Sequence, residues 1–517
     1  MRSTFMGLET SKRGLFTQQS ALYTTGHNIS NANTEGYTRQ RVNMEATLGY
    51  PGTGLNSPKT AGHIGTGVQA QSVQRMRDQF VDRQFRQEEN KLGYWGATTK
   101  AISQMEDVMS EPSEYGINQS FTDFWKSMED VLSNPIDAAA RQVMISKGEA
   151  LSESFNYMDT QLKLIQSNLG NELNVTTKDV NSILKQIASL NEQIQAVEPN
   201  GYMPNDLYDA RDVLIDQLNT LLPVSISSVP SGGNALDIAE GSVTITFNGI
   251  TLVDGNKYVQ MQAEDTDGNA ILGEDPVNPF KQFTFTELKR ASAHDNDIKN
   301  NAVSFTANTI NYSQLEPFKG QLIATIDAYG FDDGAGASGG LYPDMINKLD
   351  ALASEFVTQF NAAHRAGNGL DGSTGVDFFD ATGLTAGTMK VSITETDKVA
   401  AASVAGEVGN NENIRKLAAL NEQVWAALNN GTFQGNYQSL VGDLAVKGQE
   451  AIRMEFNSTT LKLQIENNRA SMNSVSLDEE MTNMITFQQA YNANARMITV
   501  VDECLDKIIN GMGRVGL

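Results

Sequence analysis

Apolar residues recur with helical spacing at both ends of this 517-residue chain. Over residues 5–30 an apolar residue appears every seven positions, at Leu8, Leu15, Leu22 and Ile29. A small residue stands directly before each of the first three, for example Gly14 before Leu15. This narrow stripe is closer to a coiled-coil seam than to the broad apolar face of a globular helix. We predict a helix over 5–30 that another helix approaches closely.

The closing segment carries the most regular stripe in the chain. Its seam positions alternate steps of four and three residues, as in a coiled coil. The apolar members of this seam that we expect to make contacts are Leu477, Met481, Met484, Tyr491, Ile498, Leu505, Ile509 and Met512. Both ends of the chain are therefore predicted to form helices that pack through narrow seams.

Helical spacing also dominates the middle of the chain. It resumes near Val73 and continues with breaks to Val197, and it is clearest over 162–197, where a long amphipathic helix is predicted. A short helix is expected over 206–221 and another over 342–364. A loop-and-strand patch covers 365–400, and helical patterns run from Ile414 to the end.

The pattern changes to alternation between residues 224 and 320. Val243, Ile245 and Phe247 alternate with polar residues, and Asn248-Gly249 is a strong signal for a two-residue hairpin turn. We therefore predict a β-rich domain inserted between helical segments.

These elements predict a mainly α protein with an inserted β-rich domain. We expect paired N- and C-terminal coiled-coil helices, an elongated helical body, and a distal β domain from which the chain returns. The expected units are a terminal assembly domain (1–65 plus 466–517), a helical-bundle body (66–223 plus 321–465) and a β-rich outer domain (224–320). The terminal seams could pack inside this bundle or between molecules, and the spacing alone leaves both open.

Charge and cysteine content narrow the possible partners. The formal net charge of −24 argues against nucleic acid and anionic membranes as partners. The charge is uneven, because residues 1–100 sum to +5 and the remaining 417 to −29. Cys504 is the only cysteine, so no intrachain disulfide can form. We expect no secretory signal at the N-terminus and no membrane-spanning segment.

Candidate chemistry is sparse in this sequence. The four histidines, at 27, 63, 294 and 364, lack neighbours at metal-ligand spacing. The segment starting at Asp265 begins like a calcium loop but has Ala270 at the sixth position and Pro276 at the twelfth. Glycines 334–340 are not followed by the Lys-Ser/Thr pair of a phosphate-binding loop. We expect no enzyme activity, no cofactor and no metal.

The stretch GHNISNANTEGYTRQRV, residues 26–42, is too polar for a core. Asn and Gly tolerate left-handed backbone and end helices in turns. We therefore predict a shaped turn after the first helix. Its candidate site residues are Asn31, Asn33, Gly36, Tyr37 and Arg39. Arg39 and Arg41 are expected to pair with carboxylates on a neighbouring surface.

With the preceding GLETSKRGLFTQQSAL, this stretch closely resembles the N-terminal signature of the flagellar rod, hook and hook-associated axial proteins. Its YTRQR ending is most similar to the hook–filament junction members of that family. Residues 180–194, 205–214 and 474–509 resemble three further segments of those members, in family order. The departures are Tyr208, Ala210 and Cys504, each standing where another residue is expected.

The resemblance implies a structural protein, exported unfolded through the flagellar type III channel, that forms a ring between hook and filament. It implies that the two terminal seams contact neighbouring subunits and that the turn at 31–37 shapes the inner layer. Implied partners are further copies of the chain, the hook protein, a second junction protein on the filament side, and an export chaperone on the C-terminal helix. A hook or distal-rod protein, or a secreted adhesin-like surface protein, remains an alternative.

Overall fold

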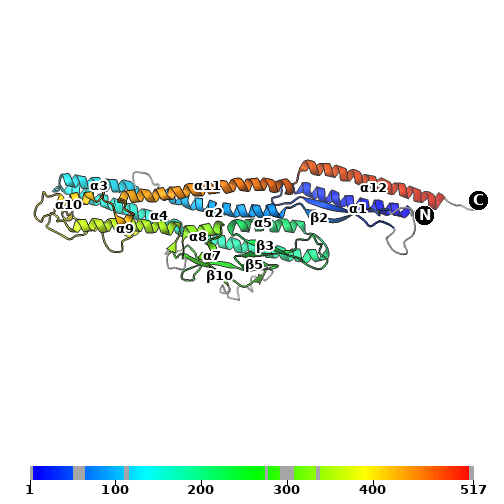
Figure 1. Ribbon diagram of the computed structural model, residues 1–517, viewed down its shortest axis with the longest axis horizontal. Helices are drawn as coiled ribbons and strands as arrows, with labels where there is room; N and C mark the ends of the chain where they lie inside the picture. Colours follow the sequence, from blue (N-terminus) through cyan, green and yellow to red (C-terminus); the bar gives the residue numbers. More distant parts are fainter. Residues whose placement is uncertain are drawn as a thin grey trace, which may run out of the picture.

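The computed structural model describes residues 4–50, 64–109, 116–273, 277–291, 308–332 and 338–511. These residues form an elongated, mainly helical rod, and both ends of the chain lie at the same end of it (Figure 1). The predicted mainly α fold with terminal helices and a β-containing region is confirmed.

The terminal module consists of two helices and a ribbon. Helix α1 (Thr4–Ser30) lies beside α12 (Leu477–Gly511), so the two ends of the chain pack together (Figure 1). Strands β1 (Gln40–Ala46) and β2 (Val68–Arg75) form an antiparallel ribbon along α1, in which Val42 is opposite Val73. The prediction that helix resumes near Val73 is wrong, because that valine completes a strand. The next helix begins at Gln79.

The body is a bundle of long helices. It contains α2 (Gln79–Met109), α3 (Ile117–Ser133), α4 (Ala138–Val197), α5 (Asn205–Leu221), α8 (Gln321–Tyr329), α9 (Leu341–Arg365), α10 (Glu412–Ala419) and α11 (Phe433–Asn473). Helix α4 is longer than predicted, because its buried stripe extends back through Leu151 and Met144. The side chain of Asp137 caps its start by accepting from the Ala139 amide.

The β region contains two small sheets. One has the order β3 (Ser225–Val229), β4 (Ser242–Phe247), β5 (Ile250–Asp254), β6 (Lys257–Tyr258) and β9 (Lys289–Arg290). The other joins β7 (Met261–Asp265), β8 (Phe280–Phe285), β10 (Asn308–Asn311), β11 (Phe331–Asp332) and β12 (Ser338–Gly339). A short helix, α7 (Tyr312–Leu315), follows β10. The predicted turn at Asn248-Gly249 is confirmed, since both residues have positive φ between β4 and β5.

The predicted distal position of the β region is wrong. The sheets lie beside the middle of the rod, against α4, and the far end consists of α3, α10 and the adjoining part of α9 (Figure 1). Asn191 of α4 anchors β4, because its Nδ2 donates to the Val243 carbonyl at 3.0 Å and its Oδ1 accepts from the Val243 amide. The apolar face of a sheet needs a covering layer, and α4 supplies one.

The far end is held by aromatic packing and a long capping segment. Phe121, Phe124, Phe356 and Phe360 lie in one cluster of stacked and edge-on rings. Residues 366–432 cover this cluster, through the 3-10 turns η2 (Ala386–Thr388), η3 (Thr396–Lys398) and η4 (Ala426–Leu428) and isolated bridges. The predicted loop-and-strand patch at 365–400 is therefore part of a longer cap.

Candidate assembly site

The buried positions of α1, which packs on both α12 and the β1–β2 ribbon, carry small and polar side chains. The fully buried positions of α1 are Ser11, Gly14, Thr17, Ala21, Thr24, Thr25 and Asn28. A Cβ atom added to Gly14 would lie 2.9 Å from the side-chain amide of Asn494, so a larger residue there would displace that side chain. The predicted close approach of a second helix at the small residues is present.

The predicted seam residues flank this buried stripe. On α1, Leu8, Leu15, Leu22 and Ile29 are half-buried. On α12, Met484, Tyr491, Ile498 and Leu505 are half-buried, whereas Leu477, Met481 and Ile509 are exposed. Met512 lies outside the described residues. The structure thus brings most of the two predicted seams together, but the apolar seam side chains are only partly covered.

Large apolar side chains also point outward from the terminal helices. On α1 these are Phe5, Phe16 and Tyr23. On α12, besides the seam positions, they are Ile485, Met497, Val500 and Ile508. Exposed apolar residues in such number on one module are typical of a surface that another protein covers.

The turn after α1 is built on Asn28. Its Oδ1 accepts from the Tyr37 hydroxyl at 2.8 Å and from the Gln40 amide at 3.0 Å. Its Nδ2 donates to the Gln40 carbonyl at 2.8 Å and to Glu480 Oε2 at 3.1 Å. Burial, together with nearby Asp206, Asp209 and Glu480, raises the pKa of Tyr37, so its hydroxyl keeps the proton that it donates.

Arg39 fastens the same turn to the start of α12. Its Nε donates to Glu480 Oε1 and its guanidinium donates to Glu479 Oε2, both at 2.8 Å. Its backbone amide donates to the carbonyl of Asn473, at the end of α11. The carboxylates predicted for Arg39 therefore belong to the same chain. Glu480 is almost fully buried, and two side chains satisfy its oxygens.

The remaining predicted turn residues have smaller roles. Asn31 caps the end of α1, with its Nδ2 donating to the His27 carbonyl at 3.1 Å. Gly36 has φ +77°, and a Cβ there would lie 2.1 Å from Val213 Cγ2, so the turn and α5 leave no room for a side chain. Asn33 is exposed. Its side chain is therefore a natural reference position for substitutions in this turn.

An ion-pair network joins the terminal module to the body. We call it the shoulder network. Its members are Arg75, Arg77, Arg86, Arg211 and Arg469 with Asp82, Asp209, Asp212, Asp216 and Glu240. Most of them lie on β2, α2, α5 and α11. Arg77 lies between β2 and α2, and Glu240 lies between β3 and β4. This one cluster therefore holds these elements together. Asp209 also accepts from the Thr38 backbone amide at 3.0 Å, which ties in the turn.

Asp212 lies at the centre of the shoulder network. Burial opposes its negative charge, but Arg77, Arg75 and Arg86 outweigh burial and lower its pKa to about 2. The five arginines and five carboxylates balance in number. A buried network with balanced charge serves mainly to specify one geometry, because the desolvation cost offsets much of the attraction.

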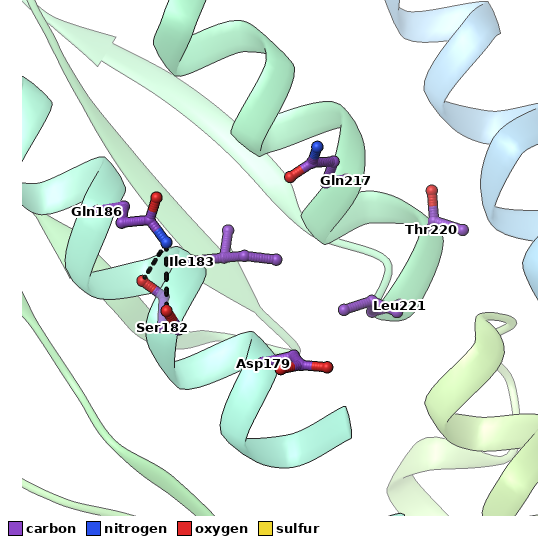
Figure 2. A pocket seen from close by; sticks show the side chains of 7 residues that line it. All are labelled: Asp179, Ser182, Ile183, Gln186, Gln217, Thr220 and Leu221. Atoms are coloured by element: carbon purple, nitrogen blue, oxygen red, sulfur yellow. Dashed lines mark hydrogen bonds between the residues drawn. The ribbon is translucent and has the colours of Figure 1, made fainter. Parts of the chain in front are cut away.

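A shallow groove of about 460 Å³ lies between α4 and α5 (Figure 2). It is lined by Asp179, Ser182, Ile183, Gln186, Gln217, Thr220 and Leu221. Gln186 Nε2 donates within its own helix to Ser182 Oγ at 3.2 Å, so these polar groups are already partnered with each other. Cys504 is exposed on α12.

No group of three or more His, Cys, Asp or Glu residues suited to a metal occurs in the described parts of the chain. In the calcium-like segment, Asp265 Oδ1 accepts from the amides of Asp267 and Asn269, as in an ordinary turn, and Pro276 lies outside the described residues. Among the helices that the structure describes, none is long and apolar enough to cross a membrane.

Sequence reasoning missed the residues that connect the segments. Asn28 lies within the polar stretch 26–42 but outside the predicted site, and Glu480, Asp209 and Asp212 carry no local signal of their role. Arg75 and Arg77 pair with Asp209 and Asp212 of α5, about 135 residues further along the chain, so no local spacing indicates these pairs. Only the charge of the acidic start of α12, Asp478-Glu479-Glu480, was available as a signal opposite Arg39.

Comparison with sequence families gives three matches along the chain. The family described as "Flagellar hook-associated protein FlgK helical domain" matches residues 102–279 and 280–379. "Flagella basal body rod protein" matches residues 8–38, and "Flagellar basal body rod FlgEFG protein C-terminal" matches residues 469–511. The last two matches coincide with the helices and turn of the terminal module.

Individual relatives match over nearly the whole chain. Flagellar hook-associated protein 1 of Bacillus subtilis is 44% identical, covering 99% of each chain. The protein of that name from Escherichia coli is 28% identical, covering 96% of this chain and 98% of its own. A solved structure of the flagellar hook junction protein FlgK from Burkholderia pseudomallei has a similar fold, with a TM-score of 0.60 and 14% identity. The match covers 76% of this chain and all of that one.

Proposed function

The chain belongs to the flagellar hook-associated protein 1 family, and from this premise we propose that its terminal module joins subunits to one another in the flagellum. It is a structural component of the hook–filament junction, located on the flagellum outside the cell. The alternative of a hook or distal-rod protein is set aside, since the FlgK helical domain covers the body of this chain.

One observation carries the proposal. The terminal module is anchored firmly at the turn and shoulder network, yet along α1 and α12 its large apolar side chains stay half-buried or exposed. Burying such a side chain contributes about 1.5–3 kcal/mol, so covering this module with copies of itself would release substantial free energy. The exposed set therefore supports a ring of identical subunits packed through the terminal helices.

We further propose the specific neighbours of the ring. The hook protein would contact it on one side and a second junction protein on the filament side. Before assembly, an export chaperone would cover the exposed apolar face of α12, from Leu477 to Ile509, because such a face invites aggregation. We propose a role without catalysis, cofactor or metal. We also propose unit boundaries near residues 65, 223, 320 and 465. The first of these would move to the end of β2, because residues 68–75 pair with β1 in the terminal module.

The experiment uses a surface position so that folding of the monomer is kept. Ile485 is 57% exposed on α12, and Ile485→Asp should leave the isolated protein folded but prevent its incorporation. Cells carrying the variant should have hooks without filaments and release flagellin into the medium. Ile485→Val is the control, because it keeps an apolar side chain at the same position, and it should build filaments normally.

A full deletion gives the reference phenotype for both variants. Electron microscopy of the deleted cells should show hooks that end without filaments. Normal filaments in the deletion would overturn the junction role itself. Normal filaments with Ile485→Asp alone would overturn only the assignment of this face of α12.

A further inference from the structure

Helix α11 has one face that is already in use. Its buried positions, Tyr437, Leu440, Leu444, Gly448, Ala451 and Ser458, follow helical steps of three and four or seven. This face packs mainly on α2, and Gly448 lies against Ile102 there. Packing on α2 therefore accounts for the apolar residues on this buried face of α11.

A second stripe on α11 is not accounted for in this way. Ile452, Phe456 and Leu463 are 55%, 70% and 53% exposed. With Ala445, Thr459 and Ala470 they follow a heptad spacing and lie on one flank, about 100° around the helix from the buried face. Single exposed apolar residues need no explanation, but a stripe with coiled-coil spacing has the form of a helix-packing surface.

Helix α4 carries a matching stripe on the outside of the body. Tyr157, Leu164 and Val175 are 50%, 53% and 57% exposed and are separated by seven and eleven residues. These intervals also keep side chains on one flank of a helix. The flank lies away from the α4 positions buried in the bundle, such as Met158, Leu162 and Leu169. One chain therefore exposes two seams of the same kind on two different helices.

We propose that the exposed stripe of α11 packs on the exposed stripe of α4 in a neighbouring copy of this chain. The inference rests on the proposed function and extends it from the terminal module to the body. A ring of identical subunits with head-to-tail contacts needs two different, complementary surfaces on each subunit. The α11 stripe ends at Ala470, three residues before the end of α11, where the terminal module begins. The stripe and the proposed contact of the terminal helices are therefore adjacent along the chain.

We place the two stripes against each other by their central residues, Phe456 of α11 and Leu164 of α4. The Tyr437 hydroxyl lies 3.9 Å from Met158 Sδ, so these residues of α11 and α4 are at the same level of the rod. Both helices run from the far end towards the terminal module (Figure 1). Leu164 is therefore level with about residue 443, and Phe456 lies about 13 residues, or roughly 20 Å, further along. If Phe456 of one subunit packs on Leu164 of the next, the two helices lie parallel, and neighbouring subunits are displaced along the rod by about 20 Å.

The test compares two exposed residues of one helix. Phe456→Asp should cause loss of filaments and release of flagellin into the medium, although the variant is exported in normal amount. Val446→Asp is the matched control, because Val446 is 69% exposed but lies on a different flank of α11. It should assemble like the unaltered protein. Normal filaments with Phe456→Asp would overturn the inference.

A cross-link tests the contact directly, even if an aspartate variant fails to fold. In a Cys504→Ser background, Phe456→Cys combined with Leu164→Cys should form disulfide-linked multimers when intact flagella are oxidised. Each single cysteine should give none. Absence of the cross-link in flagella that have normal filaments would overturn the inference, whereas the result for Ile485→Asp decides the proposed role of the terminal module separately.

Discussion

Asn28 uses every hydrogen-bonding group of its side chain inside the terminal module. Its oxygen accepts two hydrogen bonds and its nitrogen donates two, which is the full capacity of an amide. These bonds join α1, the turn and α12. No isosteric residue can reproduce the pattern, because aspartate lacks the donor that faces Glu480.

The first prediction follows from this pattern. Asn28→Asp would remove the donated bonds and place a second carboxylate beside buried Glu480. We expect the free energy of opening of the anchored start of α12, around Glu480, to fall by about 2–4 kcal/mol. Hydrogen exchange of residues 477–483 would measure the change. Asn33→Asp, at an exposed position of the same turn, is the control and should change it by less than about 0.5 kcal/mol. Equal effects of the two substitutions would contradict this account.

His364 is a buried histidine that holds the capping segment at the far end. The Ala400 amide donates to its Nε2 at 2.9 Å, so its Nδ1–H donates to the Val376 carbonyl at 2.8 Å, and both bonds hold the capping segment 366–432. Burial lowers the pKa of His364 to about 4. The neutral ring is therefore the form that fits.

The second prediction concerns pH. The unfolded chain protonates this imidazole near pH 6.5, but the folded protein resists protonation down to about pH 4. Stability from this group is therefore complete above pH 6.5 and falls by about 3 kcal/mol as the pH drops towards 4. Protease cleavage within the cap should rise over this window. In His364→Gln, which does not titrate, the rise in cleavage between pH 6.5 and 4 should be smaller. The same rise in the variant as in the unaltered protein would contradict this prediction.

At the scale of elements, the terminal helices differ from the helices of the body. The only fully buried side chain on α12 is that of Glu480, and the only fully buried apolar side chain on the described part of α1 is Ala21. Helix α4, in contrast, buries apolar residues along its whole length. Helices of this kind depend on packing, so the stability of the two groups should differ.

The third prediction is that α1 and α12 are loose in the isolated monomer and become ordered on assembly. Amide hydrogens of residues 5–30 and 484–505 should exchange much faster than those of α4, because local opening exposes little apolar surface there. Hydrogen exchange of the monomer measures this. Protection of both terminal helices equal to that of α4 would rule it out. The same segments should gain protection in assembled flagella.

The elements themselves were largely predictable from the chain. Long stripes at 162–197 and 342–364 and the Asn248-Gly249 turn lie within α4, α9 and the β4–β5 hairpin. These signals are local, since a helix or a tight turn is specified by residues near one another. Strand β2 was missed because its eight residues have no strong alternation, and their pairing partner is about 30 residues away.

At the scale of the whole molecule, sequence reasoning was weakest where distant segments meet. The shoulder network draws residues from positions 75 to 469, and no local spacing indicates that they converge. Asn191 of α4 helps to hold the sheets beside the rod, yet in the sequence it is an ordinary polar position of a helix. Of the candidate site, the seams and Arg39 were predictable from pattern, whereas the buried partners of Arg39 and Asn28 were not.

The Asn28–Glu480 hydrogen bond joins residues 452 positions apart, so it cannot form until almost the entire polypeptide is present. A chain that ends early through faulty translation or proteolysis lacks α12 and leaves Asn28 and Arg39 without their carboxylate. Its body could still fold, because the bundle core lies between residues 101 and 451. A truncated molecule therefore lacks half of the terminal module, and with it half of the surface through which we propose that subunits join.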